Sequence, residues 1–131
     1  MIVLDTHVLV WWVATPEKLS RRARTAVSAA ARRSQLIASS MSIFEIATAV
    51  RRGRLELNLP IAEWLAALRE LPELSIEPMT DAIGEHAGGL DDEFPGDPAD
   101  RVIAATALAL DVPLVTADEK LRAVADLKTV W

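Results

Sequence analysis

Acidic side chains stand at comparable places along this 131-residue chain, each beside a short aliphatic run or near the start of a helical pattern. The four are Asp5, Glu45, Asp100 and Asp118. Carboxylates held close together raise one another's pKa values unless a cation neutralises them. Clustered oxygen ligands favour magnesium or manganese where no thiolate is present, and the chain has no cysteine. If the fold brings the four acids together, we therefore expect a Mg²⁺ or Mn²⁺ site.

Helix capping offers a structural explanation for the same acids. Asp5 and Asp118 each precede a predicted helix, where an aspartate commonly serves as the N-cap. Glu45 stands three residues after Ser42, which is the spacing of a capping box. Taken singly, each of these acids can therefore be explained without any chemistry.

Two features remain that capping does not explain. Asp97 before Pro98 has the form of an N-cap and a first helical residue, yet a second acid, Asp100, follows within the same turn. The first predicted strand also runs directly into Asp5. In an open α/β sheet, ligands bind at the edge where the carboxyl ends of the strands lie. The whole set of acids therefore favours a shared site over isolated caps.

Short aliphatic strands alternate with helical patterns along the whole chain. We predict strands over residues 2–4, 35–38, 74–77, 112–116 and 127–130. We predict helices over residues 6–14, 16–33, 42–52, 59–71 and 98–110, with two more opening at residues 80–81 and at 118. Glycines and prolines make residues 88–97 the expected mobile loop. The alternation predicts a three-layer α/β/α fold with a central parallel sheet of four or five strands.

The composition indicates one folded domain spanning residues 1–131. Hydrophobic residues make up 51% and charged residues 25%, which excludes a disordered or coiled-coil chain. The absence of cysteine excludes a disulfide framework, and a reducing cytoplasm is the expected location. The apolar run from Val8 to Ala14 is far shorter than the roughly 20 residues of a membrane span. No basic residue precedes Asp5, so we expect no secretory signal.

Charge is divided unevenly between the two halves of the chain, whose overall net charge is −5. Residues 1–54 hold nine Lys or Arg and three Asp or Glu, whereas residues 55–131 hold five and sixteen. The commonest explanation is solvated helix faces. The alternative is a basic rim that attracts phosphate around an acidic centre. That rim would consist of Arg21, Arg22, Arg24, Arg32, Arg33, Arg51, Arg52 and Arg54.

Four sequence blocks stand together in the order and spacing of a known family. They are Ile2–Thr6 with Leu9 and the Trp11–Trp12 pair, Ser42–Ile46, Asp97–Arg101 with the Ile103–Ala107 run, and Leu114–Asp118. With these blocks the sequence resembles the PIN-domain family. More narrowly, it is similar to the VapC toxins of bacterial type II toxin-antitoxin systems. The resemblance covers the whole chain.

The resemblance implies a Mg²⁺- or Mn²⁺-dependent endoribonuclease that hydrolyses RNA phosphodiester bonds with a metal-activated water. The acidic residues of the family match Asp5, Glu45, Asp100 and Asp118. Of these, Asp5 and Asp100 are the expected metal ligands. The hydroxyls that support such ligands match Thr6, Ser42 and Thr116.

Other residues in these blocks carry weaker signals. We keep Asp97 as a helix cap, and we do not assign His7 as a base because a lone histidine is more often packed or solvent-facing. Arg101 is expected to pair with an acid because its neighbourhood is so acidic. Adjacent tryptophans on one helix cannot both face one core, so either Trp11 or Trp12 is expected to face a partner.

Partner proteins are expected both from the resemblance and from surplus apolar surface. The helices over residues 6–14 and 42–52 carry more large apolar side chains than one side of a small sheet can bury. These are Trp11, Trp12, Ile43, Phe44, Ile46 and Val50. We expect a homodimer, and a small VapB-like antitoxin whose amphipathic segment lies in a groove and places an arginine in the acidic pocket. Arg51, Arg52 and Arg54 would flank RNA in the free toxin.

Two alternative functions remain open at this point. Asp5 after the first strand resembles the nucleophile of a haloacid-dehalogenase-like phosphatase, although His7 stands where that family has a second acid. A non-catalytic interaction module, whose acids are all helix caps, is the alternative from a different class. A metal titration distinguishes the interaction module from the enzymes, because dispersed caps would bind cations only weakly and nonspecifically.

Overall fold

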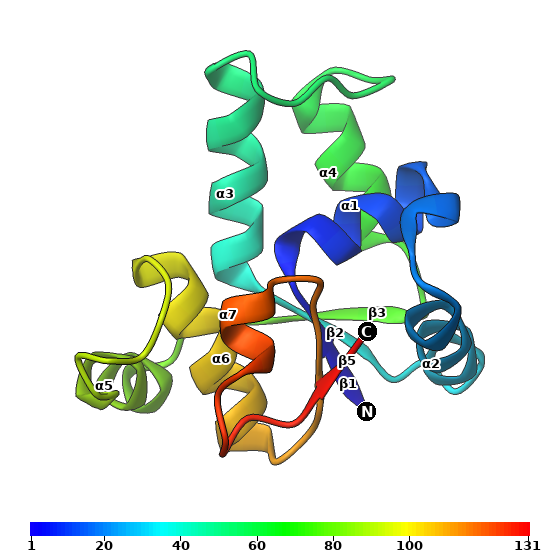
Figure 1. Ribbon diagram of the computed structural model, residues 1–131. Helices are drawn as coiled ribbons and strands as arrows, with labels where there is room; N and C mark the ends of the chain where they lie inside the picture. The colour runs from blue at the N-terminus through cyan, green and yellow to red at the C-terminus, as the bar shows by residue number, and fades with distance from the viewer.

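The computed structural model describes residues 1–131 around one five-stranded parallel sheet (Figure 1). The strands lie in the order β3-β2-β1-β4-β5, and every neighbouring pair is parallel. Their bounds are β1 Ile2–Leu4, β2 Leu36–Ser39, β3 Leu74–Glu77, β4 Leu114–Val115 and β5 Thr129–Val130. The prediction of a parallel sheet with four or five strands is confirmed, although β4 and β5 are shorter than expected.

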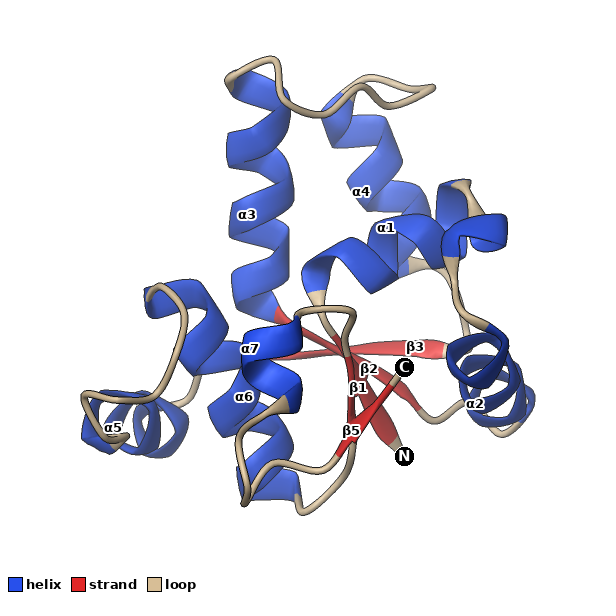
Figure 2. Ribbon diagram, in the orientation of Figure 1, coloured by secondary structure: helices blue, strands red, loops and turns tan.

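Seven α-helices and one 3-10 turn connect the strands. They are α1 Thr6–Ala14, η1 Pro16–Lys18, α2 Arg21–Arg32, α3 Ser40–Arg51, α4 Ile61–Arg69, α5 Asp81–Gly89, α6 Pro98–Leu110 and α7 Glu119–Arg122. Figure 2 shows the strands in the middle of the molecule with helices around them. Helices α3 and α4 contact each other and extend away from the sheet. None of the helices has both the length and the hydropathy that crossing a membrane requires.

Alternate side chains of β1 enter two separate cores. Ile2 and Leu4 pack with residues of α1, α2 and α4, including the buried Trp64. Val3 enters a second core with α6 and α7, and α5 packs against the outside of α6. Because the sheet is covered on both faces, its strands are continuous apolar runs. The three-layer α/β/α arrangement predicted from the sequence is confirmed.

The predicted helix over residues 16–33 is wrong in one respect, because it is two elements. Pro16–Lys18 forms a single 3-10 turn that ends at Leu19. The side chain of Ser20 then accepts a hydrogen bond from the Ala23 N–H and caps α2. A serine in the middle of the expected helix therefore serves as the cap of a new one.

The predicted capping box at the start of α3 is also wrong. The helix begins at Ser40, because Ser39 at the end of β2 caps it by accepting a hydrogen bond from Met41 N–H. Ser42 and Glu45 consequently lie inside α3. Glu45 therefore has no capping role, and its carboxylate is available for contacts with other elements.

The segment before α6 differs in part from the expected loop over residues 88–97. Helix α5 continues through Gly89, so the loop begins only at Leu90. Asp97 caps α6 and Pro98 is its first residue, as predicted. Figure 1 shows this loop running from α5 to the upper end of α6, close to the base of α3.

Candidate active site at the carboxyl edge of the sheet

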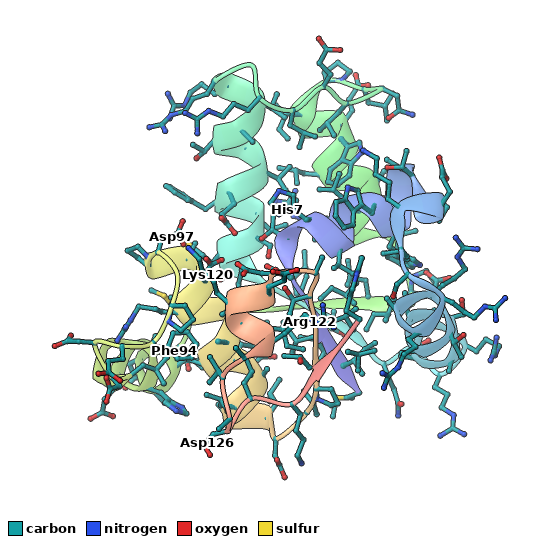
Figure 3. The ribbon with its side chains drawn as sticks, viewed as in Figure 1. His7, Phe94, Asp97, Lys120, Arg122 and Asp126 are labelled. Atoms are coloured by element: carbon teal, nitrogen blue, oxygen red, sulfur yellow. The ribbon has the colours of Figure 1, made fainter.

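The carboxyl edge of the sheet brings together the N-terminal ends of α1, α3 and α6. Asp5 follows β1 and caps α1, while Glu45 lies in the second turn of α3. Asp97 and Asp100 lie at the start of α6, which packs against α3. Figure 3 shows Asp97 at this upper end of α6. Acids that are far apart in the sequence thus reach one place.

Three carboxylates converge at this edge. One oxygen each from Glu45, Asp97 and Asp100 lie within 4.8 Å of one another. Glu45 and Asp100 are partly buried, and Asp97 is exposed. These hard oxygen donors, with no sulfur nearby, suit a divalent cation such as Mg²⁺ or Mn²⁺. The chemistry of the donor set therefore fits a metal site.

Asp97 serves both the helix and the carboxylate cluster. Its Oδ1 accepts a 3.0 Å hydrogen bond from Asp100 N–H, which makes it the N-cap of α6. The same side chain supplies an oxygen to the cluster. A carboxylate has about four lone-pair sites, so capping does not prevent metal binding. Its place in the cluster goes beyond the predicted role as a cap, and its position one turn before Asp100 is the sequence signal that the two share a face.

Asp5 is the most buried of these acids, with only 8% of its surface exposed. Its Oδ1 accepts a hydrogen bond of 2.8 Å from Thr6 N–H, and its Oδ2 accepts one of 2.7 Å from the Thr116 hydroxyl. Both oxygens are therefore oriented, and both keep a free lone pair. The charge of Asp5 also raises the pKa values of Glu45 and Asp100, which places it within electrostatic reach of the cluster.

Two hydroxyls hold Glu45 in place. Thr6 Oγ1 donates to Glu45 Oε1 at 2.6 Å and lies 2.8 Å from Ser42 Oγ. Because the single Thr6 proton goes to Glu45, Ser42 is the donor in the second hydrogen bond. These contacts join α1 to α3 at the site, and they leave Glu45 Oε2 without a partner among the side-chain hydrogen bonds of Thr6 and Ser42.

Burial and mutual repulsion raise the pKa values of two acids in the site. The pKa of Asp100 is raised from 3.8 to about 7, first by burial and then by the charges of the neighbouring carboxylates. Burial also raises the pKa of Glu45, and the hydrogen bond from Thr6 offsets part of this effect. Without a cation, Asp100 therefore carries a proton part of the time near neutral pH, and cation binding would release it.

Asp118 lies beside the site without joining the cluster. Its Oδ1 accepts a 2.9 Å hydrogen bond from Lys120 N–H and caps α7. Its own N–H donates to the Thr116 hydroxyl at 3.1 Å, and that hydroxyl donates to Asp5. The structure thus brings Glu45 and Asp100 together with Asp97, and it places Asp5 within electrostatic reach of them. Asp118 is connected to Asp5 only through Thr116.

Arg101 does not pair with an acid, contrary to the expectation from the sequence. Its guanidinium donates hydrogen bonds to the backbone carbonyls of Ala87, Leu90 and Asp91, and it lies 5.9 Å from the ring centre of Phe94. The last carbonyls of a helix have no N–H partner within the helix, so they compete with carboxylates for the hydrogen bonds of a guanidinium. Arg101 therefore ties the end of α5 and the following loop to α6.

A cavity of about 620 Å³ lies between α1 and α3 and reaches the acids Glu45 and Asp97. Its apolar lining includes Val10, Trp11, Met41, Phe44, Ile46 and Leu55. Of the predicted basic rim, Arg52 and Arg54 line this cavity, and both are exposed. Arg51 and the arginines of α2 do not line it. The idea of a basic rim around the acids therefore applies only to the far end of α3.

His7 and Trp11 lie together on the α1 side of this cavity. Their ring centres are 5.9 Å apart, and Trp11 lies 5.8 Å from Trp131 on its other side. His7 is exposed, and its charge lowers the pKa of Glu45 as a minor contribution. Trp11 and Trp12 are both half-buried and both pack against the same core, so the prediction that only one of them could face it is wrong. Trp11 also borders the open cavity.

Comparisons with known proteins agree with this geometry. The PIN domain family matches residues 2–127. Ribonuclease VapC22 of Mycobacterium tuberculosis is 38% identical over 121 residues, which are 92% of this chain and 89% of that protein. The crystal structure of VapBC2 from Rickettsia felis, bound to a DNA fragment from the promoter, is similar with a TM-score of 0.73 and 19% identity, covering 98% of this chain and 97% of that chain. A toxin-antitoxin complex from Klebsiella pneumoniae is similar with a TM-score of 0.62 and 18% identity, covering 97% and 95%. The chain therefore belongs to the PIN-domain family and, within that family, to the VapC ribonucleases.

Proposed function

We propose that this chain is the toxin of a toxin-antitoxin pair and cleaves RNA with Mg²⁺ or Mn²⁺ held by Asp5, Asp97 and Asp100, with Glu45 beside the cation. One observation carries the proposal: oxygens of three carboxylates lie within 4.8 Å of one another beside the buried Asp5. A non-catalytic module with dispersed caps would not have this arrangement. Membership of the PIN-domain family sets the phosphatase alternative aside.

In the proposed reaction, Asp5 and Asp100 bind the cation directly, and Asp97 adds a third carboxylate from the first turn of α6. When bound, the cation supplies positive charge that polarises the phosphodiester and lowers the pKa of an attacking water. Thr116 and the Thr6 N–H hold the two oxygens of Asp5 in fixed directions. These residues therefore act as a preformed cradle whose geometry the fold sets before RNA binds.

Glu45 is the proposed proton acceptor for the attacking water. Thr6 holds its Oε1, so Oε2 is the oxygen available to take the proton. A general base works best when its pKa lies near the working pH, and burial raises the pKa of Glu45 in that direction. Asp118 has a smaller role in this proposal, because its side chain caps α7 and only its backbone supports Thr116.

Arg52 and Arg54 are the proposed phosphate contacts for an RNA strand that enters along the cavity. Both line the same cavity as Glu45, and the one ion pair in the structure, Lys128 with Asp111, involves neither. Arg51 is exposed at the same end of α3 and is proposed as a flanking contact. Such contacts weaken with salt, because RNA releases counterions when arginines bind its phosphates.

Cleavage of RNA by the purified chain with Mg²⁺, with Mn²⁺ or with a chelator tests this function. We expect cleavage with either cation, none with the chelator, and none by Asp5→Asn. Asp126→Asn is the matched control, because Asp126 is exposed and Figure 3 shows it at the other end of the molecule from Asp97. Full activity in the chelator, or in Asp5→Asn, would contradict the metal-dependent mechanism.

We also propose that a small VapB-like antitoxin occupies the cavity. Phe44 borders it and is 67% exposed, which leaves a large apolar side chain for a partner to cover. An amphipathic segment could bury this surface and place an arginine against Glu45 and Asp97. That guanidinium would replace the charge of the cation and block the entry of phosphate.

Coexpression with the gene immediately upstream tests the antitoxin proposal. A small protein should copurify with the wild type and be lost with Phe44→Asp, because a charge would stand in the apolar wall. Met79→Asp is the control, since Met79 is also exposed but lies outside the cavity. A wild-type chain that copurifies with nothing and is harmless when expressed alone would count decisively against the toxin assignment.

A homodimer completes the proposed assembly. Apolar side chains such as Val13 and Leu59 are also exposed, so one partner in the cavity would not cover all of the apolar surface. Sedimentation of the isolated chain should give the mass of two copies, and a strictly monomeric chain would contradict this part of the proposal. The proposed substrate is cellular RNA, so the proposed activity belongs in the cytoplasm.

A further inference from the structure

The backbone of Gly96 lies directly against the Asp100 carboxylate. A Cβ atom at position 96 would lie 2.6 Å from Asp100 Cβ and 2.7 Å from Asp100 Oδ2. Both distances are shorter than any ordinary contact between such atoms, and Asp100 Cβ cannot move away without moving α6. Only a residue without a side chain therefore fits between the loop and Asp100 in its present orientation.

The backbone angle at position 96 adds a second restriction. Gly96 has φ +101°, a conformation that residues with side chains rarely adopt. Gly53 also has a positive φ, of +70°, but a Cβ there would meet nothing within 4 Å. A turn alone would therefore explain Gly53, whereas Gly96 combines the turn with a close approach to a carboxylate of the site.

The close approach restricts where the Asp100 carboxylate can point. With the loop backbone on one side, its oxygens stay near those of Glu45 and Asp97, within the 4.8 Å cluster. Because rotation of the Asp100 side chain leaves its Cβ in place, a side chain at position 96 would push the first turn of α6, and with it Asp100, away from the loop. That movement would pull the Asp100 oxygen out of the cluster.

Arg101 fixes the loop that carries Gly96. Its Nε and Nη1 each donate a 3.1 Å hydrogen bond, to the carbonyls of Ala87 and Asp91, and Nη2 donates to the carbonyl of Leu90. The loop residue Phe94 covers the guanidinium at 5.9 Å. Since Arg101 follows Asp100 in α6, one helical turn holds both the carboxylate and the anchor of the segment that packs on it.

We propose that Gly96 is a positioning residue that sets the direction of the Asp100 carboxylate, with Arg101 anchoring the loop that carries it. Neither residue touches the substrate or the cation in this proposal, and both act through Asp100. The inference rests on the proposed function, because Asp100 matters to the cation only if the cluster binds one.

Titration of the metal-free chain with Mn²⁺, followed by calorimetry, tests the role of Gly96. Gly96→Ala should weaken Mn²⁺ binding by about 10- to 100-fold, the range typical for residues that orient metal ligands. Gly88→Ala is the matched control, because Gly88 is exposed, has no positive φ and leaves room for a Cβ. We expect the control to bind Mn²⁺ like the wild type.

A second background separates positioning from a general loss of stability. In Asp100→Asn the side chain keeps its shape, so Gly96→Ala should still lower the melting temperature there. The residual affinity for Mn²⁺ should then be unchanged by Gly96→Ala, because the carboxylate through which it acts is gone. A further loss of Mn²⁺ affinity in this background would overturn the proposal.

Arg101→Lys introduces no steric clash at position 96. It therefore still tests whether the loop positions Asp100 if Gly96→Ala does not fold. Lysine keeps the positive charge but cannot donate to three carbonyls in a planar fork. We expect weaker Mn²⁺ binding together with a cooperative melt. Unchanged Mn²⁺ affinity in both Gly96→Ala and Arg101→Lys would overturn this inference alone, whereas a wild-type chain that binds no Mn²⁺ would overturn the proposed function as well.

Discussion

Helices α6 and α7 begin in the same local way, yet only the start of α6 forms part of the candidate site. Asp97 caps α6 by accepting a 3.0 Å hydrogen bond from Asp100 N–H, and Asp118 caps α7 by accepting one of 2.9 Å from Lys120 N–H. Each cap is followed by a further acid, Asp100 in α6 and Glu119 in α7. Both helices therefore begin with an aspartate cap and a further acid, although the cap accepts from the third residue of α6 and from the second residue of α7.

Their surroundings are what differ. Around the start of α6, burial and the charges of Asp5 and Glu45 raise the pKa of Asp100 to about 7. At the start of α7, the second acid Glu119 is exposed. An aspartate cap at the sheet edge thus joins a carboxylate cluster only where other helices bring further carboxylates against it.

Removal of the Asp100 charge should have the largest effect on activity. We expect Asp100→Asn to lower RNA cleavage by at least about 100-fold, because residues that merely support metal ligands already cost 10- to 100-fold. The same change should raise the melting temperature of the metal-free chain at neutral pH, since it removes one charge from a repulsive cluster. Cleavage assays and thermal melts measure the two effects. Unchanged cleavage would show that the start of α6 contributes no more to activity than the start of α7.

Loss of the Thr6 hydroxyl should have the next largest effect. Thr6→Val keeps the shape but removes the 2.6 Å hydrogen bond to Glu45, so we expect cleavage to fall by about 10- to 100-fold. That hydrogen bond lowers the pKa of Glu45, so the pH at which cleavage is half-maximal should rise in the variant. A pH profile of cleavage checks both points. Thr25→Val is the control, because the Thr25 hydroxyl bonds only within α2.

The stability of the metal-free chain should fall as pH rises from about 4 to about 7. The folded pKa of Asp100, about 7, lies above its ordinary value of 3.8, so the folded chain holds a proton there that the unfolded chain has lost. The contribution of the Asp100 carboxyl to the free energy of unfolding is fully present below pH 3.8 and is lost as pH rises through about 7. Thermal melts across this range should show a smaller decline in Asp100→Asn than in the wild type. Equal slopes would contradict the assigned shift.

Removal of the Asp118 charge should have the smallest effect. Asparagine caps helices about as well as aspartate, so we expect Asp118→Asn to change the free energy of unfolding by no more than about 0.5 kcal/mol. Cleavage should stay far closer to the wild-type rate than in Asp100→Asn. Denaturant unfolding and the RNA assay test this expectation. A loss of cleavage equal to that of Asp100→Asn would place Asp118 within the site and remove the contrast between the two helices.

Local patterns in the sequence predicted much of the fold and part of the site. The aliphatic runs at residues 2–4 and 74–77 are strands with the predicted bounds, because a strand buried on both faces needs apolar side chains throughout. The Asp97-Pro98 pair starts α6 as predicted. Topology then explains why the starts of α1, α3 and α6 meet, since parallel strands place their carboxyl ends at one edge.

Other assignments failed where two residues competed for one role. Ser39 and Ser42 could each have begun α3, and only the end of β2 decides that Ser39 is the cap. Arg101 could bind acids or carbonyls, and the packing of α5 on α6 brings the carbonyls within reach. Sequence spacing gives no information about such partners when they belong to another element.

The sequence by itself determined the kind of ligand available for a cation, because carboxylates without cysteine offer only hard oxygen donors. It also determined the parallel sheet, through the alternation of apolar runs and helices. Only the tertiary structure decided that Asp97 joins the cluster, that Asp118 stays outside it and that Gly96 packs on Asp100. The physical reason is that repulsion, desolvation and steric contact depend on distances of a few ångströms between elements, and these distances are set only when the helices pack on the sheet.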